Sequence, residues 1–306
     1  MNLKKVSLAA ALVVLLGVVS GCAFIRATPP PPAPTTTTSS APTTTTTVVS
    51  SPMAELGLLL FGDAGTGDST QLQVAQQMQN WAAVHRVDAL FQVGDVVYED
   101  GNPSLFAARI DAPYAQLRTT RPLWIALGNH DVMTNNGNDM ISYLGMPGRY
   151  YEKILRNGSS SLQLLVLDSN DVSDEQASWL ESKLTNSTTT WQVVAFHHPP
   201  YSCGPHGNTA SVVAKWVPIL QNNGADLVLS GHDHSYQRFQ SESTTYVVSG
   251  GGGRSLTSVS ACNAGATMNK SAVRHHFVGL EVRGNTLALT AVARTGETLD
   301  SFTITR

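Results

Sequence analysis

Runs of basic residues are missing from this 306-residue chain, and its 19 Lys and Arg are outnumbered by 22 Asp and Glu. This argues against a nucleic acid as the main partner, because binding a phosphate backbone requires clustered positive charge. Three of the cations precede residue 53, so the rest of the chain carries a net charge of about −6. Bound divalent or trivalent cations would offset much of that charge locally.

Long apolar runs are also missing, apart from residues 6–20, which are too few for a clear membrane-spanning helix. Two lysines precede this run, and small residues lead to a cysteine in Val19-Ser20-Gly21-Cys22. The pattern resembles a bacterial lipobox, in which cleavage precedes the cysteine and its thiol is acylated. An ordinary signal peptide with an incidental cysteine is the alternative. Both predict export with a signal peptide at residues 1–21, and the lipobox predicts a cell-membrane lipoprotein that faces outside the cytoplasm and is anchored through Cys22.

Apolar residues are scarce in the following segment, which is rich in proline and threonine at Pro29–Pro32 and Thr43–Thr47. Such a composition cannot bury a core, so we expect residues 22–52 to form an extended, disordered tether. Residues 53–306 are long enough for one domain with a continuous core.

Cysteine is rare, and only Cys203 and Cys262 remain once Cys22 is set aside. An even pair in an exported chain favours a disulfide bond, because an exposed lone thiol is a liability outside the cell. The alternative is two free thiols, one of them buried.

Short apolar runs alternate with amphipathic segments through most of the chain. The apolar runs predict buried strands at 55–60, 89–93, 123–127, 162–167, 191–196 and 226–229. The amphipathic segments predict helices at 69–85, 104–117, 173–184 and 209–222. Strand, helix and strand in succession imply right-handed crossovers and a largely parallel core.

The end of the chain has a different pattern, with strand-like segments and no helices between them at 245–248, 277–282, 286–293 and 301–304. These segments predict an antiparallel second sheet with a tight turn at Arg283-Gly284-Asn285. The predicted fold class is therefore α/β, a sandwich of two sheets. In such sheets, ligands gather beyond the carboxyl ends of the strands.

Five short motifs place polar side chains just after predicted strands. In order, they are Gly62-Asp63-Ala64-Gly65, Gly94-Asp95-Val96-Val97-Tyr98, Gly128-Asn129-His130-Asp131, Val194-Ala195-Phe196-His197 and Gly231-His232-Asp233-His234. One such motif would be weak support, because Gly-Asp after a strand is usually a turn. Five of them supply seven metal-ligating side chains, enough for two adjacent cations.

The chemistry of these side chains suits two different ions. Hard cations prefer oxygen ligands, whereas imidazole suits iron, zinc and manganese. The central carboxylate, Asp95, is the candidate to bridge the two ions. His232 and His234 are two positions apart, so on an irregular loop they can face different ions. Asn129 contributes a neutral oxygen, which keeps the total ligand charge low and the metals Lewis-acidic.

In this order, the motifs resemble those of the calcineurin-like metallophosphoesterase superfamily over residues 53–306. The commoner members carry Asp-x-His in the first motif, whereas this chain has Gly65 at the histidine position. Tyr98, three residues after Asp95, is where the purple acid phosphatase branch, which includes the tartrate-resistant enzymes, has a metal-binding tyrosinate. The missing histidine and the tyrosine occur together, so the resemblance is to this branch and implies an α/β/β/α sandwich.

The resemblance also implies a role for each site residue. Asp63, Tyr98 and His234 would bind Fe(III), while Asn129, His197 and His232 would bind a divalent Fe, Zn or Mn ion, with Asp95 shared. His130 and His206 would contact the phosphate and donate a proton to the leaving group. His198 would instead shape its loop with the prolines that follow. Asp131 departs from the glutamate common in plant members, which leaves its role open.

The predicted activity is that of an exported acid phosphatase, in which a metal-bound hydroxide attacks small phosphomonoesters. A phosphodiesterase of the same superfamily and a non-catalytic phosphate- or metal-binding surface protein are the alternatives. The predicted partners are therefore phosphorylated small molecules and, through the lipid anchor, a membrane.

Overall fold

The computed structural model describes residues 54–306. The predicted signal peptide, the lipidation site Cys22 and the predicted tether lie outside the described residues. No helix in the described part of the chain is both long enough and apolar enough to cross a membrane.

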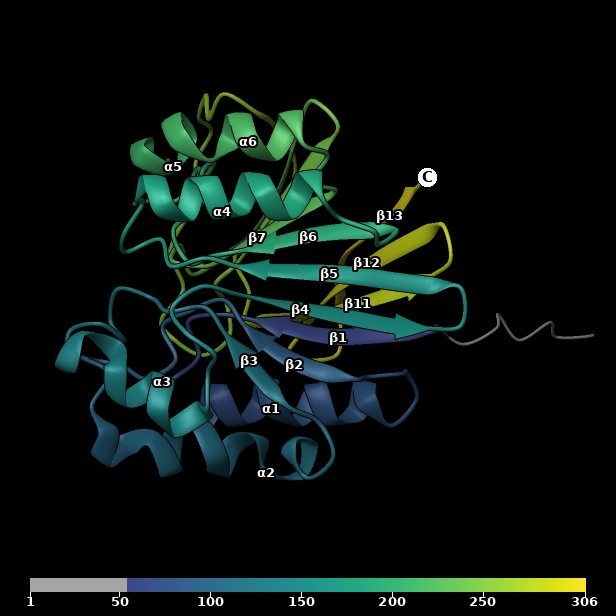
Figure 1. The fold of residues 1–306 in the computed structure, drawn as a ribbon. Helices are drawn as coiled ribbons and strands as arrows, with labels where there is room; N and C mark the ends of the chain where they lie inside the picture. Colours follow the sequence, from purple (N-terminus) through teal and green to yellow (C-terminus); the bar gives the residue numbers. More distant parts are fainter. Residues whose placement is uncertain (1–53) are drawn as a thin grey trace, which may run out of the picture. The chain divides into compact units, whose positions relative to one another are not determined.

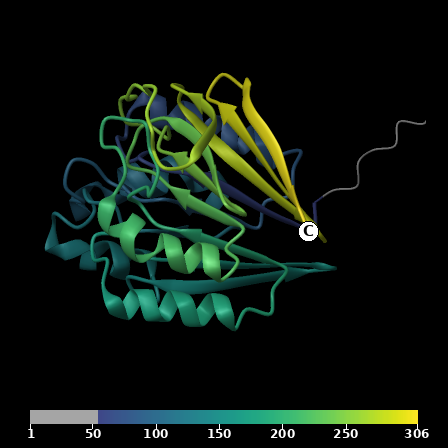
Figure 2. The ribbon, with the colours of Figure 1, turned by 90° about the horizontal axis from the view of Figure 1, so that it is seen from above.

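Two β-sheets form the centre of the fold (Figures 1 and 2). The six-stranded sheet has the order β13-β12-β11-β1-β2-β3, and the seven-stranded sheet has the order β10-β8-β9-β7-β6-β5-β4. The strands of the first sheet are β1 (Leu56–Phe61), β2 (Ala89–Gln92), β3 (Leu123–Ile125), β11 (His276–Arg283), β12 (Thr286–Ala293) and β13 (Thr298–Thr305). Those of the second are β4 (Tyr151–Asn157), β5 (Ser160–Val166), β6 (Trp191–Ala195), β7 (Leu227–Ser230), β8 (Tyr236–Ser241), β9 (Thr244–Ser249) and β10 (Thr267–Ala272).

Helices cover the outer face of each sheet. Figure 1 shows one group of helices on the side of β1–β3 and another on the side of β5–β7. The first group is α1 (Ser69–Ala82), α2 (Ala112–Arg118) and α3 (Asn138–Leu144), and the second is α4 (Asp174–Thr185), α5 (Ala210–Lys215) and α6 (Val217–Asn222). Three apolar clusters fill the space between the sheets and under each helical layer. This is the predicted α/β/β/α sandwich.

The predicted crossovers are present in both sheets. β1 pairs parallel with β2 across α1, β2 with β3, β5 with β6 across α4, and β6 with β7 across α5 and α6. The predicted tight turn is also present, because β11 and β12 are joined through Gly284, whose φ of 50° lies in the left-handed region.

The division of strands between the sheets differs from the sequence prediction. The C-terminal strands do not form a sheet of their own: β11 pairs antiparallel with β1, whereas β9 pairs parallel with β7. Every residue of β1 is buried, so this strand needs a hydrogen-bonded neighbour on both edges. β2 supplies one neighbour and β11 the other, a choice that local sequence does not specify.

Several local elements were also missed or divided. β4, β8, β10 and α3 were not predicted; β10 is mostly exposed, so it lacks the apolar alternation of a half-buried strand. The predicted helix at 209–222 is two helices that meet at Trp216, where Pro218 occupies the first turn of α6. The segment 104–117 is likewise divided into Pro103–Leu105, Ala107–Asp111 and α2.

Candidate metal centre

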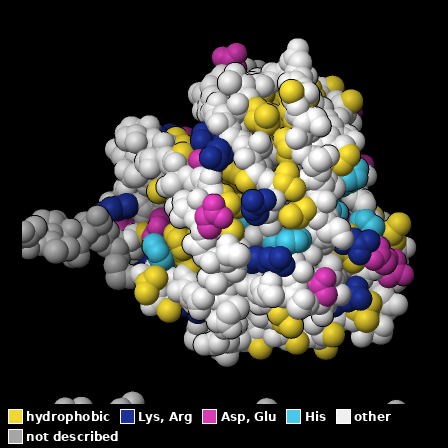
Figure 3. Space-filling model, turned by 180° about the vertical axis from the view of Figure 1, so that it is seen from behind, with side chains coloured by type: hydrophobic (Ala, Val, Ile, Leu, Met, Phe, Trp, Pro, Cys, Tyr) yellow, Lys and Arg dark blue, Asp and Glu magenta, His cyan; other side chains and the backbone are white. Residues whose placement is uncertain are grey.

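The five motifs meet at one end of the sandwich. Asp63, Asp95 and Asn129 follow β1, β2 and β3 in the first sheet, whereas the histidine motifs follow β6 and β7 in the second. The arrowheads of β5 and β6 point to this end in Figure 1. In the reversed view of Figure 3, histidine side chains gather near one edge beside basic and acidic side chains. The carboxyl ends of strands from both sheets therefore build one site.

The first ligand group surrounds the hydroxyl of Tyr98. This oxygen lies 2.9 Å from Asp95 Oδ2, 3.2 Å from Asp63 Oδ1 and 3.1 Å from His234 Nε2. Asp63 Oδ1 and His234 Nε2 are 3.5 Å apart. We call Asp63, Tyr98 and His234, together with the Oδ2 of Asp95, the phenol group.

The second ligand group surrounds the buried imidazole of His197. Its Nε2 lies 3.1 Å from Asn129 Oδ1 and 3.5 Å from Asp95 Oδ1. The ring of His232 is 5.1 Å from that of His197. We call Asn129, His197 and His232, together with the Oδ1 of Asp95, the imidazole group. Asp95 thus presents one carboxylate oxygen to each group.

Backbone carbonyls fix the orientation of two of the imidazoles. His197 Nδ1 lies 2.8 Å from Val93 O, and His234 Nδ1 lies 2.7 Å from Ser255 O. A carbonyl only accepts, so each Nδ1 carries a proton, and each Nε2 faces its ligand group. This is the arrangement of a metal-binding histidine.

The glycines that precede three of the ligands are required by close packing. A Cβ at Gly94 would lie 2.4 Å from His197 Nδ1, one at Gly128 would lie 2.1 Å from Asp95 Oδ1, and one at Gly231 would lie 2.5 Å from Asp63 Oδ2. The backbone of three ligands is itself strained, with φ of 54° at Asp63, 48° at Asp95 and 69° at His232. Such strain is typical of functional sites held in place by the surrounding fold.

The phenol group contains buried acidic side chains whose ionised forms are unfavourable without a nearby cation. Burial, together with the neighbouring charge of Asp95, raises the pKa of Asp63 well above its usual value. Burial and the two carboxylates likewise raise the pKa of the Tyr98 phenol. Burial also opposes ionisation of Asp95, yet His197 and further favourable contacts hold the pKa of that carboxyl below its usual range. A bound cation would stabilise the anionic form of all three groups.

The imidazole group combines one charged ring with one neutral ring. Burial opposes a charge on His197, but the carboxylate of Asp95 raises the pKa of that imidazole to about 10. Burial and the nearby His197 lower the pKa of His232 to about 2, so that ring stays neutral and is able to bind a metal. A cation next to Asp95 would replace the proton that His197 otherwise carries.

The residues present therefore fit two metal ions. Ligand atoms bound at about 2.0–2.2 Å from one ion lie about 3 Å from each other, and the contacts within both groups are close to that spacing. Asp63, Asp95 and His234 place ligand atoms within 4.8 Å of one another, and so do His197, His198 and His232.

A model of the calcineurin-like phosphoesterase family matches residues 57–236, more than half of the chain. The chain belongs to the calcineurin-like phosphoesterase family. Purple acid phosphatase 7 of Arabidopsis thaliana is 28% identical over 229 residues, which cover 65% of this chain and 70% of that protein. Tartrate-resistant acid phosphatase type 5 of Rattus norvegicus is 26% identical over 244 residues, 66% of this chain and 74% of the relative. These relatives confirm the predicted purple acid phosphatase branch.

Solved structures share the fold. A purple acid phosphatase from yellow lupin (Lupinus luteus) seeds matches with a TM-score of 0.72 and 19% identity, over 83% of this chain and 54% of that one. A structure described as GAP50, the anchor in the inner membrane complex of Plasmodium, matches with a TM-score of 0.75 and 17% identity, over 82% and 89%. At these identities the likeness concerns the fold alone.

Gly65 of this phosphoesterase occupies a position with no room for a side chain. A Cβ there would lie 1.9 Å from Val96 O, and the Gly65 carbonyl accepts a hydrogen bond from the backbone of Tyr98. The missing histidine and the tyrosine are therefore linked by packing, since the loop that carries Tyr98 fills the space that a residue-65 side chain would need.

The two predicted phosphate-contacting histidines border the ligand groups. His130 Nε2 lies 4.0 Å from Asp95 Oδ2, and the His130 ring lies 4.6 Å from that of Tyr98. The ring of His206 lies 4.1 Å from that of His232. Cys203, three residues before His206, forms a disulfide bond with Cys262.

Asp131 binds backbone groups of two motif loops. Its buried carboxylate accepts hydrogen bonds from the backbone N–H groups of Val96, Val97 and Gly128, at 2.8, 3.1 and 2.9 Å. Burial, together with the charge of Asp95, raises the pKa of Asp131 to about 7. This residue holds the second and third motif loops together, which answers the question that the sequence left open.

His198 lies closer to the site than the sequence indicated. Its ring is 4.6 Å from that of His232, and its Nδ1 is 2.8 Å from Ser169 Oγ. Burial lowers the pKa of His198 to about 3. Because the residue is adjacent to His197 and precedes two prolines, its sequence position indicated only a loop.

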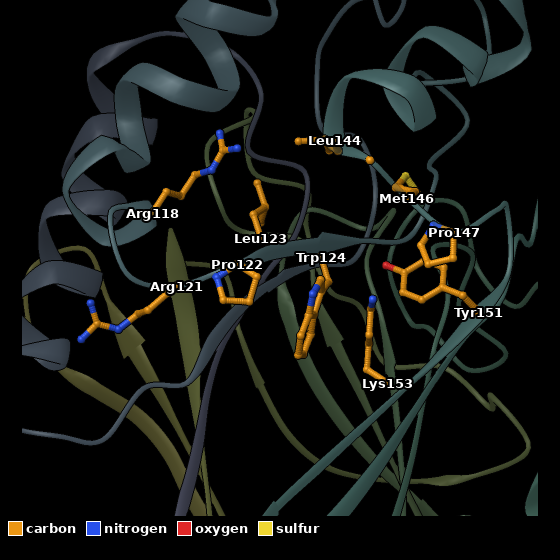
Figure 4. A pocket seen from close by; sticks show the side chains of 11 residues that line it. Arg118, Arg121, Pro122, Leu123, Trp124, Leu144, Met146, Pro147, Tyr151 and Lys153 are labelled. Atoms are coloured by element: carbon orange, nitrogen blue, oxygen red, sulfur yellow. The ribbon is translucent and has the colours of Figure 1, made fainter.

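A separate pocket of about 270 Å³ lies between the edge strands β3 and β4 (Figure 4). Arg118, Arg121 and Lys153 line it together with Trp124. Figure 4 shows that Arg121 points away from Lys153 and that the charged ends of Arg118, Arg121 and Lys153 lie apart, so these cations do not converge on one anion. The five motifs therefore remain the candidate site.

Proposed function

We propose that this protein is an exported acid phosphatase that hydrolyses phosphomonoesters at a centre of Fe(III) and a divalent ion. The observation that carries the proposal is the arrangement of the phenol and imidazole groups on either side of Asp95, with different oxygens of that carboxylate facing each. The named relatives, which are purple and tartrate-resistant acid phosphatases, support the same reaction.

The ligand chemistry supports two unlike ions. The phenol group offers two carboxylates and a phenol, oxygen ligands that suit a small, highly charged ion such as Fe(III). The imidazole group offers two imidazoles and a neutral amide, which suit divalent Fe, Zn or Mn. When bound, two such ions would clamp the phosphate and activate a water at acidic pH.

The chain's own residues would complete the reaction at the edge of the site. His130 and His206, when protonated, would donate hydrogen bonds to the phosphate oxygens and place positive charge where negative charge develops. One of them would transfer its proton to the leaving-group oxygen as the bond to phosphorus breaks. The exposed side of His206 leaves room for an alcohol leaving group, since 44% of that side chain is accessible.

The deciding experiment compares p-nitrophenyl phosphate with its bis ester, with and without a chelator. We expect faster hydrolysis of the monoester at acidic pH and loss of activity when the metals are removed. Faster hydrolysis of the diester would identify a phosphodiesterase instead. No hydrolysis of either by protein with both metals bound would identify a metal- or phosphate-binding protein.

The proposal includes export and a lipid anchor, for which the support is Val19-Ser20-Gly21-Cys22 after an apolar run. Stable retention at a membrane requires more than one acyl chain, as in bacterial lipoproteins. The Cys22→Ser variant is expected to move from the membrane to the soluble fraction. A variant that still fractionates with membranes would contradict the anchor and leave the phosphatase proposal intact.

A further inference from the structure

Asp233 is a buried carboxylate that belongs to neither ligand group, although it stands between His232 and His234. It has no exposed surface. Its Oδ1 lies 2.8 Å from His206 Nδ1 and accepts a second hydrogen bond, at 3.3 Å, from the His206 backbone. Its Oδ2 accepts a hydrogen bond from the hydroxyl of Ser202. Both oxygens are thus bound by the loop 202–206, which carries His206.

A second layer of hydrogen bonds holds this loop in place. Ser202 Oγ accepts bonds from the backbone of Gly204 and from Gln237 Nε2, both at 3.0 Å. Gln237 Oε1 accepts one from the backbone of Cys203 at 2.7 Å. The loop is also tied to a distant part of the chain by the disulfide bond between Cys203 and Cys262.

The loop fits closely around the carboxylate. A Cβ at Gly204 would lie 2.3 Å from Asp233 Cγ, so only glycine allows this approach. Such packing leaves the carboxylate little freedom to rotate, and it fixes the direction in which Oδ1 meets the imidazole of His206. An anchor for the loop alone would need only the backbone and Ser202 contacts. The additional contact to a ring nitrogen indicates that the orientation of the imidazole is being set.

The other nitrogen of His206 is left for a ligand. Nδ1 is taken by Asp233, and in the described part of the chain Nε2 has no hydrogen-bond partner. The ring lies 4.1 Å from that of His232, a member of the imidazole group. Asp233 Oδ1 meets both the backbone N–H and the Nδ1 of His206, so Nε2 is the nitrogen that can meet a phosphate ester.

We propose that Asp233 is the positioning residue of His206: it fixes the Nδ1 proton and the ring orientation so that Nε2 donates to the leaving-group oxygen. This inference rests on the proposed phosphatase function. As water adds to phosphorus and the bond to the leaving oxygen breaks, the Nε2 proton moves to that oxygen. The water leaves one hydrogen on the product phosphate, and its other proton restores His206 Nε2, while the Nδ1 proton stays in its hydrogen bond to Asp233.

The kinetic test uses two substrates that differ in their need for a proton. An alkyl phosphate has a basic leaving group that needs a proton, whereas the 2,4-dinitrophenolate of 2,4-dinitrophenyl phosphate leaves without protonation. General-acid catalysis typically contributes 10²–10⁴-fold, so Asp233→Asn should lower kcat for the alkyl ester about 100-fold and for the activated ester less than about fivefold. In a His206→Ala background, Asp233→Asn should cause no further loss, because it acts through that ring.

Ser202→Ala is the matched control, since it removes a bond to the other oxygen of the same carboxylate. Its kcat should fall far less than that of Asp233→Asn, and both variants should keep two metal ions, although the loss of buried hydrogen bonds should lower the melting temperature of Ser202→Ala. An equal loss on both esters, or a full further loss in the His206→Ala background, would overturn the inference.

A second measurement does not depend on activity. In zinc-loaded protein with ¹⁵N-labelled histidine, NMR should show the Nδ1–H form of His206 and a change of tautomer in Asp233→Asn. An unchanged His206 signal would overturn the inference even in an active phosphatase. Conversely, Asp233→Asn could change the His206 signal while the wild type hydrolyses no ester. That result would establish the link between the two residues and refute the proposed function.

Discussion

The phenol group and the imidazole group face one another across Asp95, yet they are built from opposite chemistry. In the phenol group, Asp63 and Tyr98 are buried acids whose charged forms are costly without a cation. In the imidazole group, neutral Asn129 and His232 gather around His197, which carries a proton because Asp95 is beside it. The phenol group needs a cation to ionise its buried acids, whereas the imidazole group already holds a positive charge on His197.

This difference teaches how one site can hold two unlike ions. The phenol group favours an ion whose high charge ionises the phenol directly, since an unperturbed tyrosine has a pKa near 10. The imidazole group favours a divalent ion with affinity for nitrogen. Asp95 serves both groups, whereas every other ligand serves only one. Substitutions at Asp95 and in each group should therefore have distinct effects.

The largest effect is expected from Asp95→Ala, which removes the one side chain that serves both groups. Both ions should be lost or bound weakly, and kcat should fall about a thousandfold or more, because the metals supply several kcal/mol of transition-state stabilisation. Metal analysis of the purified protein measures the bound ions, and steady-state kinetics measure kcat. Asp174→Asn, at an exposed aspartate, is the control and should be neutral. Full metal content in Asp95→Ala would contradict the bridging role.

Partial chelation should separate the two groups. The divalent ion is expected to leave first, because the imidazole group offers neutral ligands and one shared carboxylate oxygen, whereas the phenol group surrounds its ion with anions. Activity should fall about 100-fold and return when zinc is added, as expected if the divalent ion supplies about 3 kcal/mol. Loss of both ions in parallel would remove the distinction between the groups.

Tyr98→Phe should alter only the phenol group. Phenolate bound to Fe(III) absorbs visible light, so the purple colour expected of the oxidised wild type should disappear. Activity should fall only about tenfold, equivalent to about 1.4 kcal/mol, because the other ligands and Asp95 remain. Absorption spectra and kinetics test both points. A colourless wild type that is fully active and free of iron after growth with iron would refute the Fe(III) assignment.

The smallest effect on catalysis is expected from adding Gly65→His to Tyr98→Phe. The histidine found at this position in other family members should restore neither the metal nor activity, because a Cβ would collide with Val96 O. Overpacking should instead lower the free energy of unfolding by about 1–3 kcal/mol. Gly148→Ala is the control, since its nearest contact is 3.6 Å away. Restored iron binding would show that packing does not exclude the histidine.

The sequence was sufficient to predict those features that depend on residues close together along the chain. A glycine followed by Asp, Asn or His after an apolar run indicates a strand end with a close backbone approach, and it marked Asp63, Asp95, Asn129 and His232 as candidates. Tyr98, His197 and His234 were marked only by the order of all five motifs. The β1–α1–β2 and β5–α4–β6 crossovers could also be predicted, because local periodicity sets both strand and helix.

Only the tertiary structure decided which distant segments pair and which side chains face the site. A strand's sequence records that both faces are buried but not which strand covers each edge, so the pairing of β11 with β1 could not be predicted. Asp131 and Asp233 are alike in sequence, each an aspartate that directly follows a histidine of the site. One binds the backbone of two loops and the other binds His206, because a side chain's role depends on the groups that folding brings within hydrogen-bond distance.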